Sequence, residues 1–334
     1  MTSSFTRISV ALCTFNGADF LEDQLWSIDK QSVTPFELIV CDDGSADDTI
    51  NILEKFKSKA DFPVRIYQNR EQIGVLKNFT KTIGLCEGDY IALCDQDDIW
   101  LPDKLAVSYE AMKRAESDRN KDIPLLVYSD LRVVSSEGAV ISSSFMDQNK
   151  IKPPQKKPLR TLLVQNFVTG CTVLMNRALV EAALPIPEKV LMHDWWLALV
   201  AASLGKIIYI PDATVLYRQH SGNIIGSKAF FSLSNLLRLL DISSLELEIA
   251  SLFKQGMALR DRLGERPDYC APVYPVYLKS FLDAAQNNGI KTAFAAMRFN
   301  IKKNPWPRNL FFIMLLLKGG YLRYLRSCQD IFDE

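Results

Sequence analysis

Three aspartates close an apolar run of this chain, and their spacing suits the binding of a divalent cation. The run "DYIALC" is followed directly by Asp95, Gln96, Asp97 and Asp98. Hard divalent ions take oxygen ligands, and Mg²⁺ typically binds one or two carboxylates together with substrate phosphates. On an extended strand Asp95 and Asp97 point the same way and Gln96 points elsewhere, so that one acid can meet a metal ion and the other a ribose. Alternatively, Asp97 or Asp98 caps a helix that starts at Pro102, or the acids form a solvated turn.

Two further polar clusters follow apolar runs nearer the start of the chain. Thr14, Phe15 and Asn16 follow one run, and Asp42 and Asp43 follow the next. If these runs are parallel strands, their carboxyl ends share one edge of a sheet, where ligands of such sheets bind. Up to five carboxylates then meet at one rim, which is costly unless a cation or hydrogen-bond donors compensate them.

The elements that must position these residues alternate between strand and helix. Apolar, β-branched runs of strand length recur at "RISVALCTF", "FELIVC", "PVRIYQ", "DYIALC" and "PLLVYS". Helical spacing of apolar residues separates them, for example from Ala18 to Lys30 and from Asp47 to Lys57. Strands that are apolar on both faces and are linked by crossover helices predict an α/β fold with a mostly parallel sheet flanked by helices.

The composition limits which kinds of binding partner and which cellular compartment are expected. Lys plus Arg and Asp plus Glu number 39 each among 334 residues, so no overall charge favours nucleic acid as a partner. The seven cysteines are scattered and form no C-x-x-C pair, which favours reduced, buried thiols and a cytoplasmic location. The start "MTSSFTRISV" lacks the features of a signal peptide, and no apolar stretch is long enough to span a membrane.

An ordered set of motifs makes about the first 220 residues resemble a family 2 glycosyltransferase of the nucleotide-diphospho-sugar transferase (GT-A) fold. The motifs are "CTFNGADFLEDQLWSI", "ELIVCDDGSADDT", "NREQIGVLKNF", "GDYIALCDQDDIWLPDKL", "FVTGCTVLMNRAL" and "HDWW". Within that family the string "DQDDIW" is similar to that of bacterial rhamnosyltransferases that build O-antigen and other surface polysaccharides. The resemblance implies an inverting, metal-dependent transferase that moves a single sugar from a nucleoside diphosphate.

The resemblance also implies which residues bind the nucleotide sugar. Thr14 and Phe15 match positions that line the base, with Asn16 beside them, and the Phe15 ring matches the stacking face. Asp43 matches the acid that accepts a hydrogen bond from the pyrimidine N3, and Lys77 matches a basic residue near the diphosphate. The alternatives are core packing for Phe15, helix capping for Asp43 and a solvated helix position for Lys77.

A divalent cation, Mg²⁺ or Mn²⁺, is the cofactor that the resemblance implies. Its expected ligands are Asp97, Asp95 and His220, while Asp95 and Gln96 also contact the nucleotide sugar. For His220, a loop histidine without a role is an equal alternative. A zinc site is not expected, because neither histidine has a second His or Cys at a metal-ligand spacing.

Asp194 in "LMHDWWLALV" matches the general base of the family, which takes the proton of the acceptor hydroxyl. It precedes the predicted amphipathic helix from Trp195 to Leu204, so the alternative is an N-cap. Many relatives carry an acid at the position of His193, and no chemistry is assigned to it. Of Trp195 and Trp196, at least one is expected to pack in the core.

The donor is expected to be a UDP- or dTDP-sugar, and L-rhamnose is one candidate for its sugar. The acceptor is expected to be a lipid-linked saccharide or a polysaccharide. The Gln-x-x-Arg-Trp string of processive synthases is absent, which favours single-sugar transfer. Two alternatives remain open. One is a sugar nucleotidyltransferase on a related sheet, although "CTFNGADFL" lacks its Gly-rich phosphate loop. The other is a non-catalytic protein that binds saccharides or acts as a scaffold on the same fold.

The last third of the chain changes to helical periodicity, which predicts a catalytic domain at 1–225 and a helical region at 226–334 joined through "HSGNIIGS". Between residues 284 and 329 there are eight basic and no acidic residues, around the apolar run "LFFIMLLL". This pattern predicts a helix that lies on the anionic inner face of the cell membrane. The alternative is a core helix with a basic solvent face.

Overall fold

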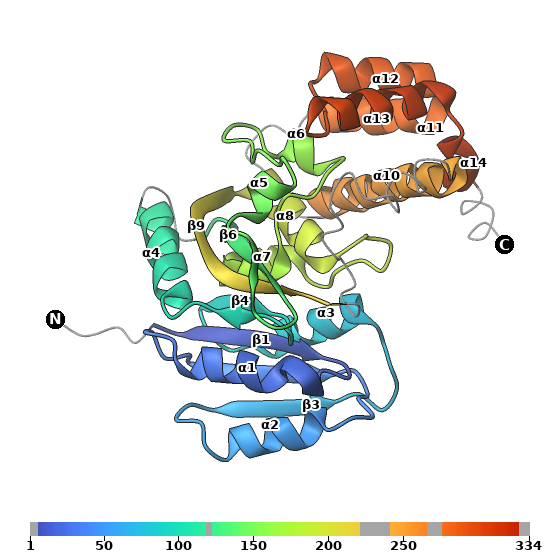
Figure 1. The fold of residues 1–334 in the computed structure, drawn as a ribbon. Helices are drawn as coiled ribbons and strands as arrows, with labels where there is room; N and C mark the ends of the chain where they lie inside the picture. The colour runs from blue at the N-terminus through green and yellow to red at the C-terminus, as the bar shows by residue number, and fades with distance from the viewer. Residues whose placement is uncertain (1–5, 118–121, 221–240, 266–275, 327–334) are drawn as a thin grey trace. The chain divides into compact units, whose positions relative to one another are not determined.

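The computed structural model describes residues 6–117, 122–220, 241–265 and 276–326, which Figure 1 shows as ribbon. The chain divides into two compact units. The first consists of residues 1–145, 168–188 and 205–226, and the second of residues 146–167, 189–204 and 227–334. The predicted division at residue 225 stays a prediction, because all but the first residue of the linker "HSGNIIGS" lies outside the described residues.

One sheet organises the first unit. Its strands are β1 (Ile8–Thr14), β2 (Glu37–Asp42), β3 (Val64–Gln68), β4 (Tyr90–Cys94), β5 (Ile99–Trp100), β6 (Leu125–Ser135), β7 (Val140–Ser142), β8 (Leu174–Asn176) and β9 (Lys206–Gln219). They lie in the order β3-β2-β1-β4-β8-β6-β9-β5, with β7 paired to β6. The four strands β3, β2, β1 and β4 are parallel, as the apolar runs predict. Beyond β4 the sheet is mixed, because β8 runs antiparallel to both of its neighbours.

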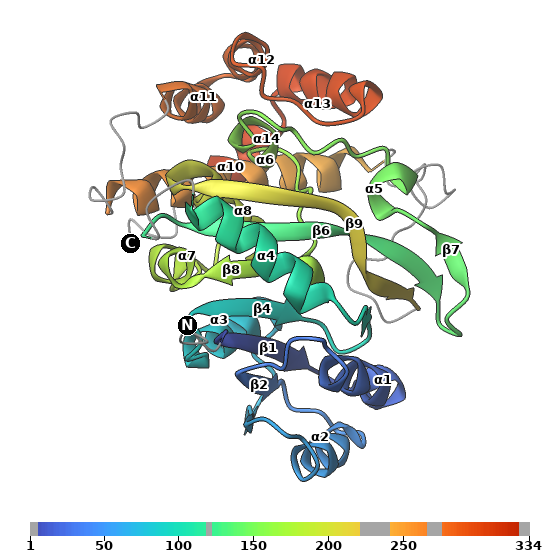
Figure 2. The ribbon, with the colours of Figure 1, turned by 90° about the vertical axis from the view of Figure 1, so that its left-hand side faces the viewer.

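Helices cover both faces of this sheet. The first unit contains α1 (Ala18–Asp29), α2 (Thr49–Lys57), α3 (Val75–Leu85), α4 (Lys104–Ser117), the 3₁₀ turn η1 (Gly170–Thr172) and α7 (Arg177–Ala183). The inward sides of α1, α2 and α4 share one core with alternate residues of β1, and α4 crosses β6, β8 and β9 (Figure 2). Helix α3 packs on β1 and β2. The strand residues in between, such as Ile39, point to the other face of the sheet and are buried there.

In the described part of the second unit the regular elements are helices. They are α6 (Leu159–Leu162), α8 (His193–Leu204), α10 (Ile242–Gly264), α11 (Val276–Asn287), α12 (Gly289–Arg298), α13 (Trp306–Lys318) and α14 (Tyr321–Arg326), and the short α5 (Phe145–Gln148) spans the boundary between the units. Among the described helices, none has both the length and the apolar composition that a membrane crossing requires.

Helix α8 differs from its prediction. It starts at His193 rather than Trp195, and it is buried on nearly all sides, so the expected amphipathic pattern is wrong. Trp196 is fully buried, which confirms the core role expected for at least one of the two tryptophans. A helix that is apolar all round is typical of a helix buried in a protein core.

Candidate functional site

The loops after β1 and β4 meet at the point where the strand order changes direction: β2 and β3 lie on one side of β1, and β4 lies on the other. In open α/β sheets such a switch point is the usual place of a ligand. Strand β4 ends at Cys94, so Asp95 to Asp98 form a bend and not the extended strand that the sequence suggested. The short strand β5 separates this bend from α4, so the alternative of helix capping by Asp97 or Asp98 is also wrong.

Gln96 joins these two loops. Its Oε1 accepts a hydrogen bond from the Phe15 N–H at 2.8 Å, and its Nε2 donates one to the Phe15 carbonyl at 3.1 Å. A Cβ on Gly17 would lie 2.3 Å from the Gln96 amide oxygen, so a larger residue at position 17 would displace the Gln96 side chain. The Phe15 ring stays 39% exposed, so it is available for stacking and is not a core residue.

The loop after β1 is also tied to the loop after β2. Asn16 has a φ of 46°, and its N–H donates to Ser45 Oγ at 2.8 Å while its Oδ1 accepts from the Ala46 N–H at 2.9 Å. Thr14 is buried and donates to Asp42 Oδ2 at 2.9 Å. The loop that carries Phe15 is therefore held on both sides.

Asp43 is buried and anchors the loop before α3. Its Oδ1 accepts from Asn69 Nδ2 at 2.9 Å and from the Ile73 N–H at 2.8 Å, and its Oδ2 accepts from the Gly74 N–H at 2.8 Å. A carboxylate offers about four acceptor positions, so these three bonds leave room for one more donor. The predicted contact with a base is compatible with this structural role.

Asp97 lies against His220, which is 123 residues away in the chain. Asp97 Oδ2 and His220 Nε2 are 2.9 Å apart, and both side chains are mostly buried. The His220 ring packs on Phe20 with 4.5 Å between ring centroids, and the Arg218 guanidinium lies 4.9 Å from the centroid of the Phe20 ring. Phe20 therefore fixes the direction from which His220 approaches Asp97.

Arg218 holds this arrangement together and was not assigned a role from the sequence. Its Nε donates to the Asp97 carbonyl at 3.2 Å, its Nη1 to the Ser136 carbonyl at 2.8 Å and its Nη2 to Asp23 Oδ2 at 2.7 Å. The charge of a buried arginine needs such partners. The only local signal was its place two residues before His220.

Asp97 and His220 lie close enough together to supply two ligands to one divalent cation. Two ligands at right angles on an ion with bonds of about 2.1 Å would be about 3.0 Å apart, close to the separation of Asp97 Oδ2 and His220 Nε2. Among the described residues, Asp95 is grouped instead with Asp98 and Cys171, whose ligand atoms all lie within 4.8 Å of one another and of an Asp95 oxygen. Burial raises the pKa of both Asp98 and Cys171 well above their ordinary values.

Lys77 lies in the first turn of α3 and forms an ion pair with Glu188 at 2.8 Å. The hydrogen bond from Lys77 lowers the pKa of the Glu188 carboxyl. Both side chains are exposed, so the pair is weak and can exchange for a phosphate.

Asp194 lies in the second unit, in the first turn of α8. Its Oδ1 accepts from the Trp195 N–H at 2.6 Å and from Asn166 Nδ2 at 3.3 Å, and the residue is buried. Trp195 is fixed in turn by a 2.6 Å bond from its Nε1 to the Leu162 carbonyl. Burial lowers the pKa of the neighbouring His193 to about 3, so this imidazole is neutral at physiological pH.

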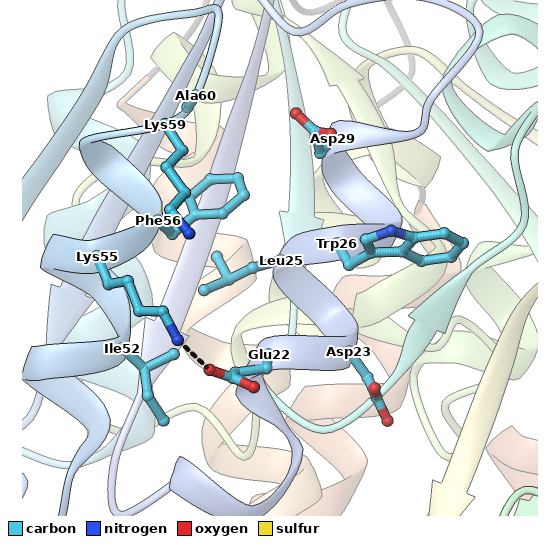
Figure 3. Close-up of a pocket in the computed structure, with 10 residues that line it drawn as sticks. All are labelled: Glu22, Asp23, Leu25, Trp26, Asp29, Ile52, Lys55, Phe56, Lys59 and Ala60. Atoms are coloured by element: carbon cyan, nitrogen blue, oxygen red, sulfur yellow. Dashed lines mark hydrogen bonds and ion pairs between the residues drawn. The ribbon is translucent and has the colours of Figure 1, made fainter.

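A groove of about 440 Å³ lies elsewhere, between α1 and α2 (Figure 3). Glu22 and Lys55 form an ion pair of 3.3 Å across it, and Leu25, Ile52 and Phe56 are among its apolar lining residues. None of the predicted site residues lines this groove. The carboxyl ends of β1 and β4, rather than this groove, hold the groups suited to chemistry.

Comparisons with known proteins agree on a likeness to glycosyltransferases. The model of the family "Glycosyl transferase family 2" matches residues 9–182. The dTDP-rhamnosyl transferase RfbG of Shigella flexneri is 30% identical over 232 residues, which cover 66% of this chain and 75% of that protein. The chain spans 60% of the length of other curated relatives, from mycobacteria.

Solved structures resemble the whole chain at lower identity. Residues 1–349 of S. aureus TarS in complex with UDP-GlcNAc superpose with a TM-score of 0.53 and 18% identity, over 97% of this chain and 92% of that one. The mannosyltransferase PcManGT from Pyrobaculum calidifontis, in complex with GDP-Man and Mn²⁺, gives a TM-score of 0.52 and 15% identity over 99% and 89%.

Proposed function

Because this chain belongs to glycosyl transferase family 2 and has the GT-A fold, we propose that it moves a single sugar from a nucleoside diphosphate sugar to a saccharide acceptor, with inversion at the anomeric carbon. The likeness to a dTDP-rhamnosyl transferase supports a UDP- or dTDP-sugar donor, with L-rhamnose as the sugar. The acceptor is a lipid-linked saccharide or a polysaccharide. The catalytic domain is proposed to span residues 1–225.

One observation carries this proposal: Asp97 and His220 converge beside the Gln96–Phe15 link at the switch point of the sheet. Phe15, Thr14 and Asn16 would receive the base, and Asp43 has an acceptor position left for the base N3–H.

The diphosphate and the metal ion would use the neighbouring groups. Lys77 would exchange Glu188 for a phosphate oxygen. Asp97, Asp95 and His220 would hold a Mg²⁺ or Mn²⁺ ion, with Asp95 and Gln96 also near the sugar nucleotide. When bound, such an ion stabilises the negative charge that develops on the departing diphosphate.

The general base is proposed to be Asp194. Its carboxylate takes the proton of an acceptor hydroxyl while that oxygen forms a bond to the anomeric carbon, and the bond from this carbon to the diphosphate oxygen breaks with its electron pair. The hydrogen bonds from Asn166 and the Trp195 N–H to Oδ1 orient the carboxylate for this step.

Separate Asp97→Asn and Asp194→Asn variants test both roles. We expect Asp194→Asn to lower the rate of sugar transfer by roughly 10²- to 10⁴-fold, the usual contribution of a positioned base, and Asp97→Asn to lower it through loss of a metal ligand. The assay follows release of nucleoside diphosphate from UDP- and dTDP-sugars with Mn²⁺ or Mg²⁺. Asp61→Asn, which changes an exposed aspartate between α2 and β3, serves as the control.

The two variants should differ in what they lose. Asp97→Asn is expected to weaken the response to metal, and Asp194→Asn to lower turnover while the donor still binds. Transfer at the wild-type rate in both variants would show that the site is wrongly assigned. Formation of a sugar nucleotide from a nucleoside triphosphate, with release of pyrophosphate, would replace the proposal by a nucleotidyltransferase.

A further inference from the structure

Helices α12 and α13 form an antiparallel hairpin in the second unit. They lie side by side in both views (Figures 1 and 2), and the start of α12 touches the end of α13. A Cβ on Gly289 would lie 2.2 Å from the Leu316 carbonyl oxygen, so glycine permits this close approach. The hairpin is therefore a defined element, and each of its helices has a buried side.

Each of the two helices also has an exposed, apolar side. We define the apolar stripe as the large exposed apolar residues of the two helices: Ile290, Phe294, Met297, Trp306, Leu310, Met314 and Leu317. Their spacing of three or four residues places those of each helix on one side. Trp306 is 73% exposed and Phe294 is 60% exposed, which is unusual for side chains of this size.

The surroundings of the stripe are basic. Lys291 and Arg298 are exposed on α12 next to its apolar residues, and Lys318 is exposed at the end of α13. From residue 284 to 329 the chain has eight basic residues and no acidic one. Two of the eight, Lys303 and Arg323, pair with Glu248 and Glu246 of α10.

We propose that the α12–α13 hairpin docks on an anionic lipid bilayer, with the apolar stripe inserted between headgroups and the basic side chains on lipid phosphates. Both helices are too short to cross the bilayer, but their pattern suits a helix lying in its interface. A tryptophan such as Trp306 is a typical interfacial anchor. A second copy of the chain would instead bring two basic surfaces together, which opposes association.

Vesicle flotation of the full chain tests the proposal without reference to catalysis. We expect binding to vesicles that contain phosphatidylglycerol, little binding to vesicles of phosphatidylcholine alone, and release at high salt. The double variant Trp306→Ser/Leu310→Ser should weaken binding by at least roughly tenfold, because it removes two inserted side chains. Trp26→Ser, which changes a 62% exposed tryptophan on α1, is the matched control.

A second set of variants tests the basic residues of the hairpin. Lys291→Gln/Arg298→Gln/Lys318→Gln should weaken binding to anionic vesicles by about a hundredfold. The same change at Lys55, Lys57 and Lys59 of the α2 region should leave binding intact. Equal binding to neutral and anionic vesicles, binding to neither, or loss of binding in both controls would overturn the proposal. Self-association abolished by Trp306→Ser/Leu310→Ser would also overturn it, in favour of a second copy. Because vesicle binding is measured without a donor, its failure leaves the proposed glycosyl transfer untouched.

Discussion

Carboxylates that follow neighbouring strands differ in their surroundings, and the surroundings decide what each can do. Asp43 accepts three hydrogen bonds from N–H groups and supports a loop. Asp98 is fully buried, and burial together with Asp97 and Asp95 raises its pKa well above the ordinary value. Asp97 instead meets the His220 ring. Of these acids, Asp97 is therefore the one that we propose as a metal ligand together with His220.

His193 gives a prediction on pH. Burial lowers its folded-state pKa to about 3, below the ordinary value of about 6.5. As the pH falls below 6.5 the unfolded chain binds a proton that the folded chain does not, so stability is lost between about pH 6.5 and 3. At pH 5 the loss amounts to about 2 kcal/mol.

We expect His193→Gln to melt with a smaller change in Tm between pH 7 and pH 5 than the wild type. Differential scanning fluorimetry at both pH values checks this. An unchanged pH dependence in the variant would show that His193 can be protonated in the folded protein.

Lys104 on α4 gives a prediction on stability. It is buried, its Nζ has no hydrogen-bond partner among the described residues, and it lies 3.9 Å from the centroid of the Trp100 ring. Burial lowers its pKa to about 8, so holding the charge at neutral pH costs free energy, about 3 kcal/mol for a change from the ordinary 10.4. Since the folded pKa is depressed, stability is lost as the pH falls from about 10 to 8.

Lys104→Met should therefore raise the Tm at pH 7 and reduce its change between pH 8 and pH 10, because methionine fills a similar volume without a charge. Lys113→Met on the same helix is the control. The Lys113 pKa is raised by its bond to Glu116, so this change should lower the Tm or leave it unchanged. A lower Tm for Lys104→Met would indicate that a buried partner needs the charge.

At the scale of elements, Asn176 connects three of them. Its Oδ1 accepts from the Leu179 N–H at the start of α7 and from the Leu125 N–H at the start of β6, at 3.1 and 2.9 Å. Its Nδ2 donates to the Ile123 carbonyl at 2.8 Å, and the side chain is buried. A single side chain thus caps a helix and fixes the start of the strand that pairs with β8 and β9.

Asn176→Ala should lower the free energy of unfolding by roughly 3 kcal/mol, because it removes a cap and leaves two buried backbone groups without a partner. Asn288→Ala, at the exposed N-cap of α12, should cost only about 1 kcal/mol. Urea unfolding of both variants gives the comparison. Similar losses in the two would mean that the bonds of Asn176 to β6 contribute little.

At the scale of the whole molecule, the overall charge balance conceals local differences. The net charge is zero, yet a basic excess gathers in the helices of the second unit, while Asp43, Asp95 and Asp97 follow strand ends of the first. Two ligands of opposite character, a metal–nucleotide complex and an anionic surface, therefore suit different units of one chain.

Donor binding should stabilise the whole chain only when a metal ion is present. At a hundred times its Kd a ligand adds about 2.7 kcal/mol, which corresponds to a rise in Tm of several degrees. We expect this rise with a UDP- or dTDP-sugar plus Mn²⁺ or Mg²⁺, and not after chelation or in Asp97→Asn, while Asp61→Asn should keep it. A metal-independent rise in both variants would remove Asp97 from the metal site.

The sequence by itself determined the main strands and helices of the first unit and the edge of the sheet that carries the candidate site residues. Strands such as β1 and β2 follow from β-branched apolar runs, and polar residues after them predict a ligand edge because parallel strands end together. These inferences succeed because they depend on neighbours in the chain. The motif resemblance also identified the family.

Only the tertiary structure decided which of these side chains form hydrogen bonds or other contacts with distant residues. The reciprocal Gln96–Phe15 bonds, the three donors on Asp43 and the approach of His220 to Asp97 all join residues far apart in the chain. Such contacts depend on strand order and on the paths of several loops together. Local spacing carries no information about either, so a list of acids at a strand end cannot show which one is best placed for a metal ion.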